Sequence, residues 1–358
     1  MESVLTVPET RRAALEEIAT TLLNAQRVAL TTHVNADGDG AGSEVAIASW
    51  LAALGKHVRL VNPTPYPDMF RFLLEDPAWV ADAATSAGDV ALREADLLVV
   101  LDTAEPGRIG RVARVTTGRV VIVIDHHVEA NASFSGPGIQ DVNACATGEL
   151  VYDLMLVAGL PRPWAETVLN GIYTAIVTDT GSFRFSNTTR RAHAIAGDLL
   201  EQGVDPEAMY RRIYATVPLR RITLLRHALE RLEVDPEYPI TWITIERGAM
   251  DRLGATSEDL EGVVDHARSI EGTEVAILFR ETSDGSTKVS LRSAGEANVN
   301  AVARQFGGGG HIKASGALVP EPLAQVRPRV LEATRAALRA TGMDLSRAAR
   351  ERTGSARL

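Results

Sequence analysis

Short apolar blocks and longer segments with helical periodicity alternate through the first half of the chain. The apolar blocks predict buried strands at residues 27–32, 57–61, 96–101 and 120–124. The segment 43–54 has apolar residues at helical spacing and ends at Gly55, a common helix stop. Strands that alternate with helices predict a parallel sheet with helices on both faces.

Acidic and histidine residues follow three of the predicted strands. His33 comes directly after the first strand, Asp102 after the third, and the triplet Asp125-His126-His127 after the fourth. Ligands of open parallel sheets bind beyond the carboxyl ends of the strands. We therefore expect these side chains to converge on one site.

The predicted loop after His33 adds two carboxylates. Asp37 and Asp39 are two residues apart, so in an extended loop both side chains point to the same side. Two carboxylates aimed at one place repel unless cations neutralise them, and Gly38 between them lets the backbone turn. The alternative is that these are ordinary turn residues, but their register with the other acidic clusters favours metal binding.

Asp179 completes the acidic set from a different direction. It follows a predicted helix over residues 166–177 and would approach the sheet edge from the side. Carboxylate and imidazole ligands are typical of Mn²⁺ or Mg²⁺ sites, whereas zinc and iron clusters use thiolate-rich sites. The sequence therefore predicts a shared metal site and a hydrolase of phosphate esters.

The polar triplet at 125–127 ends a run of apolar residues and would need partners to offset its desolvation. A lone histidine at a strand end is more often structural than a ligand, but an Asp-His-His triplet there is unusual. Asp125 can hold one imidazole by a hydrogen bond, as metal-bound histidines usually require. The other histidine would then be available to the substrate.

Taken together, these motifs resemble the DHH phosphoesterase superfamily, which is named for the triplet. The matching motifs are His-x-x-x-Asp-x-Asp at 33–39, Leu-Asp-Thr at 101–103, Asp-His-His at 125–127 and Thr-Asp-Thr-Gly-Ser-Phe at 178–183. The second half resembles the associated C-terminal domain of that superfamily, through Val-Ser-Leu-Arg-Ser at 289–293 and Phe-Gly-Gly-Gly-Gly-His at 306–311. Length and motifs are most similar to the group that degrades nanoRNA and 3′-phosphoadenosine 5′-phosphate (pAp).

The resemblance implies two divalent cations, Mn²⁺ ahead of Mg²⁺, with Asp102 bridging them. One cation would be bound by His33, Asp37 and Asp102, and the other by Asp39, Asp102, His126 and Asp179. His127 would face the scissile phosphate and serve the departing oxygen, because its ordinary pKa lies near working pH. Arg108 is a candidate phosphate contact, with a solvated loop arginine as the alternative.

The second half of the chain has a different pattern of predicted strands and helices. Strands are predicted at 240–245, 274–280 and 287–292, a hairpin turn at 282–285, and helices at 257–269, 299–306 and 322–340. We predict an α/β catalytic domain at residues 1–204 and a helical connector with a bend at Pro218 at residues 205–236. A smaller α+β domain across a cleft is predicted at residues 237–343, and a tail at residues 344–358.

A glycine run in the second domain is the other functional candidate. Consecutive glycines from Gly307 expose backbone N–H groups that can form a nest for phosphate. A flexible linker or a helix stop is the alternative. The neighbouring basic residues favour substrate binding by Arg292, Gly308, Gly309, Gly310, His311 and Lys313.

Charge limits the partners. With 37 basic and 46 acidic residues, the net charge of −9 argues against coating of long or duplex nucleic acid, and short RNA or small nucleotides fit better. Local cations could still line a cleft or be ordinary surface charges, namely Arg268, Arg280, Lys288, Arg292 and Lys313. Aromatic residues make up only 5%, so extended base stacking is not expected, although Phe183 or Phe185 could stack on one base or pack in the core.

Cys145 is the single cysteine, so no intramolecular disulfide can form, and a reducing cytoplasm is expected. Residues 1–12 lack the apolar run of a signal peptide, and no segment approaches the roughly 20 apolar residues that cross a bilayer. We therefore expect a cytoplasmic protein without a membrane partner. The sequence is also compatible with a homodimer.

The sequence leaves two classes of function open. One is a hydrolase of short oligoribonucleotides and pAp, with a cyclic-dinucleotide or linear dinucleotide phosphodiesterase as its nearest competitor. The other is a sensor that holds a nucleotide without turnover. The complete ligand set favours the hydrolase.

Overall fold

The computed structural model describes residues 4–127, 134, 136–310 and 312–341. The chain forms two compact units, Met1–Thr216 and Val217–Leu358. The boundary falls inside the segment predicted as a connector, so that α7 (Pro206–Ile213) belongs to the first unit and α8 (Leu219–Leu229) to the second. Among the described helices, none combines the length and the apolar character needed to cross a bilayer.

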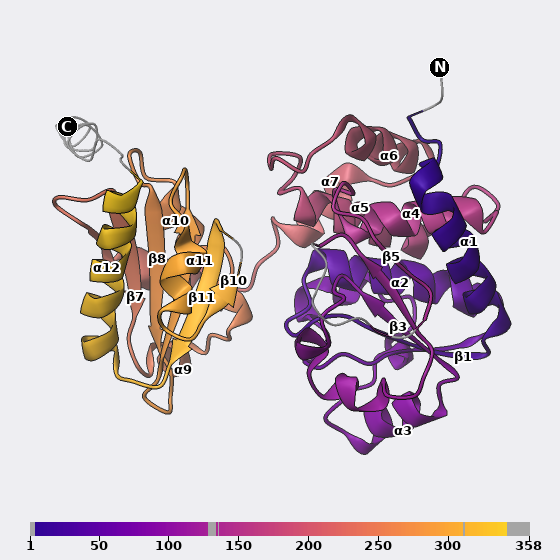
Figure 1. Cartoon of the computed structure of the whole chain (residues 1–358), viewed down its shortest axis with the longest axis horizontal. Coiled ribbons are helices and arrows are strands. Elements are labelled where there is room, and N and C mark those ends of the chain that lie inside the picture. The colour runs from indigo at the N-terminus through magenta and orange to yellow at the C-terminus, as the bar shows by residue number, and fades with distance from the viewer. Residues whose placement is uncertain (1–3, 128–133, 135, 311, 342–358) are drawn as a thin grey trace. The chain divides into compact units, whose positions relative to one another are not determined.

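The first unit is built on a parallel sheet of five strands in the order β2-β1-β3-β4-β5. Figure 1 labels β1, β3 and β5 of this sheet. The strands are β1 (Arg27–Thr31), β2 (His57–Leu60), β3 (Leu97–Leu101), β4 (Val121–Asp125) and β5 (Gly138–Gln140). Four of them match predicted strands within two residues at either end, whereas the short β5 was not predicted. The predicted parallel α/β fold is confirmed.

Helices cover both faces of this sheet because alternate strand residues point to opposite sides. Leu30 and Leu101 pack with the helices of one face, while Ala29 and Val100 pack on the other face beside α3. The helices of the unit are α1 (Glu9–Asn24), α2 (Gly38–Ala53), α3 (Ser86–Glu94), α4 (Thr147–Val157), α5 (Glu166–Asp179) and α6 (Arg190–Glu201), with α7 after them. Short 3₁₀ helices span Asp68–Leu73, Pro77–Trp79 and Pro106–Val115.

Helix α2 begins earlier than its periodicity predicted. The glycine-rich stretch 38–42, expected to be a loop, forms the first turns of the helix, and Asp37 caps it by accepting the N–H groups of Asp39 and Gly40. The glycines serve close packing instead of a turn. A Cβ at Gly42 would lie 2.3 Å from the carbonyl oxygen of Gly171 in α5. The two helices therefore touch backbone to backbone.

The second unit is a mixed sheet of six strands in the order β10-β11-β9-β8-β7-β6. Only β7 and β8 are parallel to each other; the other neighbouring pairs are antiparallel. The strands are β6 (Leu232–Val234), β7 (Ile240–Ile245), β8 (Val275–Glu281), β9 (Thr287–Ser293), β10 (Gly309–Gly310) and β11 (Ala314–Val319). The predicted α+β character of this part is confirmed.

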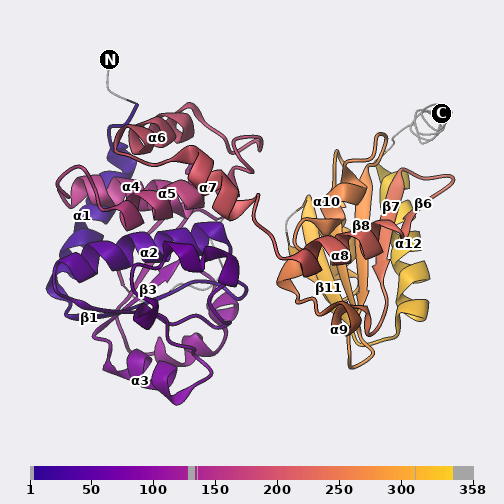
Figure 2. The same cartoon turned by 180° about the vertical axis from the view of Figure 1, so that it is seen from behind.

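One face of this sheet packs against α11 (Val299–Arg304) and α12 (Leu323–Ala340), and the other against α8, α9 (Ala249–Leu253) and α10 (Val263–Arg268), as Figure 2 shows for α8 and α9. The prediction of a single helix over 257–269 is wrong. This segment forms a 3₁₀ turn (Glu258–Leu260) followed by α10. Gly262 separates the two, and its φ of 77° lies in the left-handed region. A continuous helix cannot pass through that conformation.

Candidate metal centre

The first group of predicted ligands gathers where β1 and β3 end. Nε2 of His33 lies 3.2 Å from Oδ2 of Asp102 and 3.7 Å from Oδ2 of Asp37. The other ring nitrogen of His33, Nδ1, lies 2.9 Å from the carbonyl oxygen of Val34. Because a carbonyl oxygen can only accept, Nδ1 carries the hydrogen. Nε2 is therefore the ring nitrogen that faces the two carboxylates, and it is the nitrogen that would bind a metal ion.

The second group contains His126, Asp39 and Asp179. Nε2 of His126 lies 3.6 Å from Oδ2 of Asp39 and 3.7 Å from Oδ2 of Asp179. These separations are too long for hydrogen bonds, and this buried nitrogen has no hydrogen-bond partner among the described residues. An ion about 2.1 Å from each ligand would fit between such atoms. The donor set therefore fits a divalent cation.

Asp102 belongs to both groups. Its Oδ2 faces His33, whereas its Oδ1 lies 3.6 Å from Nε2 of His126. The residue follows β3 with a φ of 61°, in the left-handed region that non-glycine residues seldom occupy. Strain of this kind clusters at functional sites, and here it turns the carboxylate toward both ligand groups.

The carboxylates of this centre are held together against their own repulsion. Burial, and then the charges of Asp37, Asp179 and Asp125, raise the pKa of Asp102 well above its ordinary value. Burial and the charge of Asp102 do the same to the pKa of Asp39. A cation between Asp39 and Asp102 would offset both the burial of their charges and the repulsion between them.

The start of α4 supports these carboxylates. The backbone N–H groups of Thr147 and Gly148 donate to the two oxygens of Asp39 at 2.7 and 2.9 Å, and the hydroxyl of Thr147 donates to Asp102 at 3.2 Å. The first N–H groups of a helix have no partner within it, so they suit a carboxylate. The sequence analysis did not single out Thr147, although a Thr-Gly pair at a helix start was a visible signal.

Asp179 is also supported by a residue that the sequence analysis missed. The side-chain amide of Asn187 donates to Oδ2 of Asp179 at 3.0 Å and to the carbonyl oxygen of Cys145 at 2.8 Å. Nothing in the local sequence distinguishes Asn187 from an ordinary loop asparagine.

The structure gives Asp125 a different partner from the one expected. Asp125 was expected to orient the metal-bound histidine, but its Oδ1 lies 2.8 Å from Nδ1 of His127 and also accepts the backbone N–H of His127. Nδ1 of His126 faces the carbonyl oxygen of Ala144 at 3.4 Å instead. Burial alone would raise the pKa of Asp125, but the hydrogen bonds and charge of His127 outweigh it and lower that pKa.

His127 lies beside the ligands, since potential ligand atoms of Asp102, His126 and His127 fall within 4.8 Å of one another. Arg108 is partly buried in the 3₁₀ helix after β3, and its positive charge counteracts part of the rise in the pKa of Asp102. Its backbone carbonyl accepts the N–H of Val34, beside His33. Arg108 is therefore part of the loop structure that surrounds the centre.

The glycine run of the second unit is folded, and its first two N–H groups do not form the predicted nest. Gly307, with a φ of 74°, and Gly308 donate to the carbonyl oxygens of Arg304 and Ala303 and so close α11. Gly309 and Gly310 form β10 beside β11. Of the predicted basic partners, Arg292 is half-buried on β9, Lys313 is exposed, and His311 lies outside the described residues.

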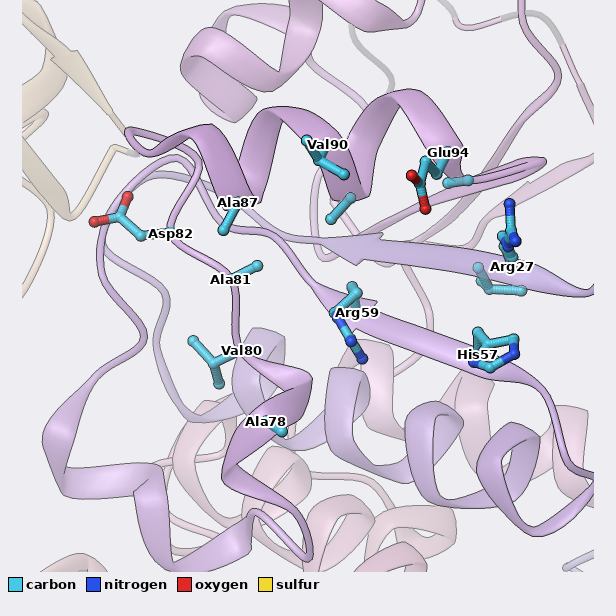
Figure 3. A pocket seen from close by; sticks show the side chains of 13 residues that line it. Arg27, His57, Arg59, Ala78, Val80, Ala81, Asp82, Ala87, Val90 and Glu94 are labelled. Atoms are coloured by element: carbon cyan, nitrogen blue, oxygen red, sulfur yellow. The ribbon is translucent and has the colours of Figure 1, made fainter.

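The first unit also has a groove of about 610 Å³ that is distinct from this centre. Figure 3 shows the side chains that line it. Arg27 and His57, which line it, are the first residues of β1 and β2. The groove therefore lies at the amino ends of these strands, whereas the ligand groups follow carboxyl ends. We assign the candidate site to the ligand groups.

Both units match known domain families. Residues 27–176 match the DHH family, N-terminal domain, and residues 243–340 match the DHHA1 domain. The bifunctional oligoribonuclease and PAP phosphatase NrnA of Thermus thermophilus is 32% identical over 87% of this chain and 90% of its own length. The Bacillus subtilis protein of that name is 27% identical over 85% of this chain and 92% of its own.

A solved structure is also similar. The exopolyphosphatase-related protein of Bacteroides fragilis superposes with a TM-score of 0.83 at 26% identity and covers 92% of this chain and 96% of its own.

Proposed function

Because this chain belongs to the DHH family of phosphoesterases and carries a DHHA1 domain, we propose that it hydrolyses short oligoribonucleotides to mononucleotides and pAp to AMP. Relatives that match over most of their length are named for these two activities. Two divalent cations, Mn²⁺ ahead of Mg²⁺, are its proposed cofactors.

The observation that carries this proposal is the pair of ligand groups that share Asp102. His33 and Asp37 would hold one cation, and Asp39, His126 and Asp179 the other. Cations in such a pair activate water and neutralise charge on the phosphate as the ester bond breaks.

The side chains around the centre have separate tasks in this proposal. Asp125 fixes the ring of His127 through Nδ1, which leaves the opposite edge of the imidazole for a proton transfer to the departing ester oxygen. Thr147 and Asn187 hold Asp102 and Asp179 in position. In the second unit, we propose that Arg292, Lys313, His311, Gly309 and Gly310 bind the rest of the substrate, whereas the N–H of Gly308 is already used to close α11.

The test is a comparison of substrates with the purified full chain. With Mn²⁺ and with Mg²⁺, we expect mononucleotide release from di- and trinucleotides and phosphate release from pAp, with little cleavage of longer RNA or cyclic di-AMP. Preferred cleavage of cyclic di-AMP would favour the cyclic-dinucleotide phosphodiesterase. Nucleotide binding by folded, metal-loaded protein without any product would favour the sensor.

A further inference from the structure

Three basic side chains share one face of the β8–β9 hairpin. Lys288, Ser290 and Arg292 alternate along β9 and therefore point to the same side. Arg280 of β8 is the direct cross-strand partner of Lys288, and directly opposed residues share a face. Two cations thus stand side by side, and a third lies four residues further along the strand.

Arg280 and Lys288 have no ion-pair partner within the described residues, whereas the negative charge of Asp265 acts on Arg292. Like charges directly opposite each other destabilise a sheet. Partial burial and the charge of Arg280 lower the pKa of Lys288, which reflects that repulsion. A basic pair of this kind is a cost to folding unless it serves an anion.

Arg280 also has unused hydrogen-bonding capacity. One terminal nitrogen of its guanidinium donates to the hydroxyl of Ser257 at 2.9 Å. Its Nε is buried and has no hydrogen-bond partner among the described residues. A buried donor without an acceptor is unfavourable, so an acceptor from a ligand would stabilise it.

The side chains of Arg280, Lys288 and Arg292 line one pocket of about 200 Å³. Ser290 contributes a hydroxyl between them, and Glu261 is the single carboxylate of the lining. Guanidinium, ammonium and hydroxyl donors around one small pocket are the groups that bind phosphate.

We propose that Arg280 and Lys288 form a second phosphate site in this unit, which binds a backbone phosphate further along an oligoribonucleotide than the one at Arg292. This inference rests on the proposed function. Lys288 and Arg292 are four residues apart on β9, which corresponds to about 13 Å of extended strand. Mononucleotide substrates engage only the nearer site, so the Arg280–Lys288 site acts on oligonucleotides alone.

The test uses Arg280→Ala and Lys288→Ala in the full chain, assayed in parallel on a trinucleotide and on pAp. Each substitution is expected to lower kcat/KM for the trinucleotide by about tenfold or more, the size expected for loss of a charged hydrogen bond, and to leave pAp within about twofold. Lys288→Arg retains the charge and should restore trinucleotide turnover. Arg327→Ala, on α12 against the opposite face of the sheet, is the matched control and should change neither activity.

Equal losses on both substrates, or no loss on either, would overturn this inference. If the unmodified protein cleaves neither substrate, the proposed function fails, and the second site is tested by binding alone. Fluorescence anisotropy of a labelled trinucleotide in EDTA should then show weaker binding by both variants. The log–log slope of affinity against salt should also become shallower by roughly 0.7 for each phosphate-binding cation that is removed. Unchanged binding would refute the site.

Discussion

The amide nitrogen of Asn187 lies 3.0 Å from Oδ2 of Asp179, and the same amide donates to the carbonyl oxygen of Cys145. Residues that orient a metal ligand in this way typically change metal affinity 10–100-fold when they are replaced. We therefore expect Asn187→Ala to weaken Mn²⁺ binding by about that factor in isothermal titration calorimetry.

The matched control is Asn170→Ala. The side chain of Asn170 contacts Glu166 on the exposed side of α5, so its removal should leave Mn²⁺ affinity unchanged. If both variants bind Mn²⁺ as the unmodified chain does, Asn187 has no part in the centre.

His127→Ala should separate turnover from metal binding. Loss of a positioned general acid typically costs about 10²–10⁴-fold in rate, so we expect a fall of that order in kcat with Mn²⁺ affinity nearly unchanged. His57→Ala, at the amino end of β2, should affect neither quantity. A variant of His127 that loses Mn²⁺ binding instead would reassign this residue as a ligand.

Asp102→Asn should have opposite effects with and without metal. Without divalent cations, the substitution removes a buried charge that is repelled by Asp37, Asp179 and Asp125, so the Tm should rise. In the unmodified chain, Mn²⁺ at about a hundred times its Kd should stabilise the fold by about 2.7 kcal/mol. Differential scanning calorimetry should show that the variant lacks most of this stabilisation, and an undiminished effect of Mn²⁺ would contradict the bridging role.

Gly42→Ala should destabilise the first unit. The added Cβ would lie 2.3 Å from the carbonyl oxygen of Gly171, and overpacking typically costs about 1–3 kcal/mol. Gly197→Ala in α6 meets nothing within 4 Å and should be neutral or stabilising by up to about 1 kcal/mol. Urea unfolding of the two variants measures the difference, and equal stabilities would contradict the backbone contact between α2 and α5.

Glu44 should make the stability of the first unit depend on pH. Burial raises the pKa of its carboxyl to about 8, although the hydrogen bond from Asn62 and the charge of His33 oppose the rise. A folded pKa above the unfolded one means that the native state binds the proton more tightly, so this contribution is complete at acid pH and declines as pH rises from about 4.5 toward 8.

Glu44→Gln should remove that decline while keeping the acceptor for Asn62. In EDTA, urea unfolding at pH 5 and pH 8 should show the variant gaining stability relative to the unmodified chain only at pH 8. A constant difference at both values would mean that Glu44 does not change its protonation between pH 5 and pH 8 and would contradict the raised pKa.

Sequence periodicity predicted the strands of the first unit well because buried parallel strands are short, continuous apolar runs. It also placed His33, Asp102 and the triplet at strand ends, where a parallel sheet brings distant residues together. It did not predict the start of α2, because glycine disfavours helices by intrinsic propensity. Only the contact with Gly171 explains why glycine occupies position 42.

The sequence by itself therefore determined the fold class, the residue types of the candidate metal centre and the ends of the strands that carry them. These follow from local periodicity and from the shared direction of parallel strands. The tertiary structure alone decided that Asp125 holds His127, that Asn187 supports Asp179, and that Arg280 lies opposite Lys288. Such pairings depend on side-chain direction and strand register, which a linear pattern of polar residues does not encode.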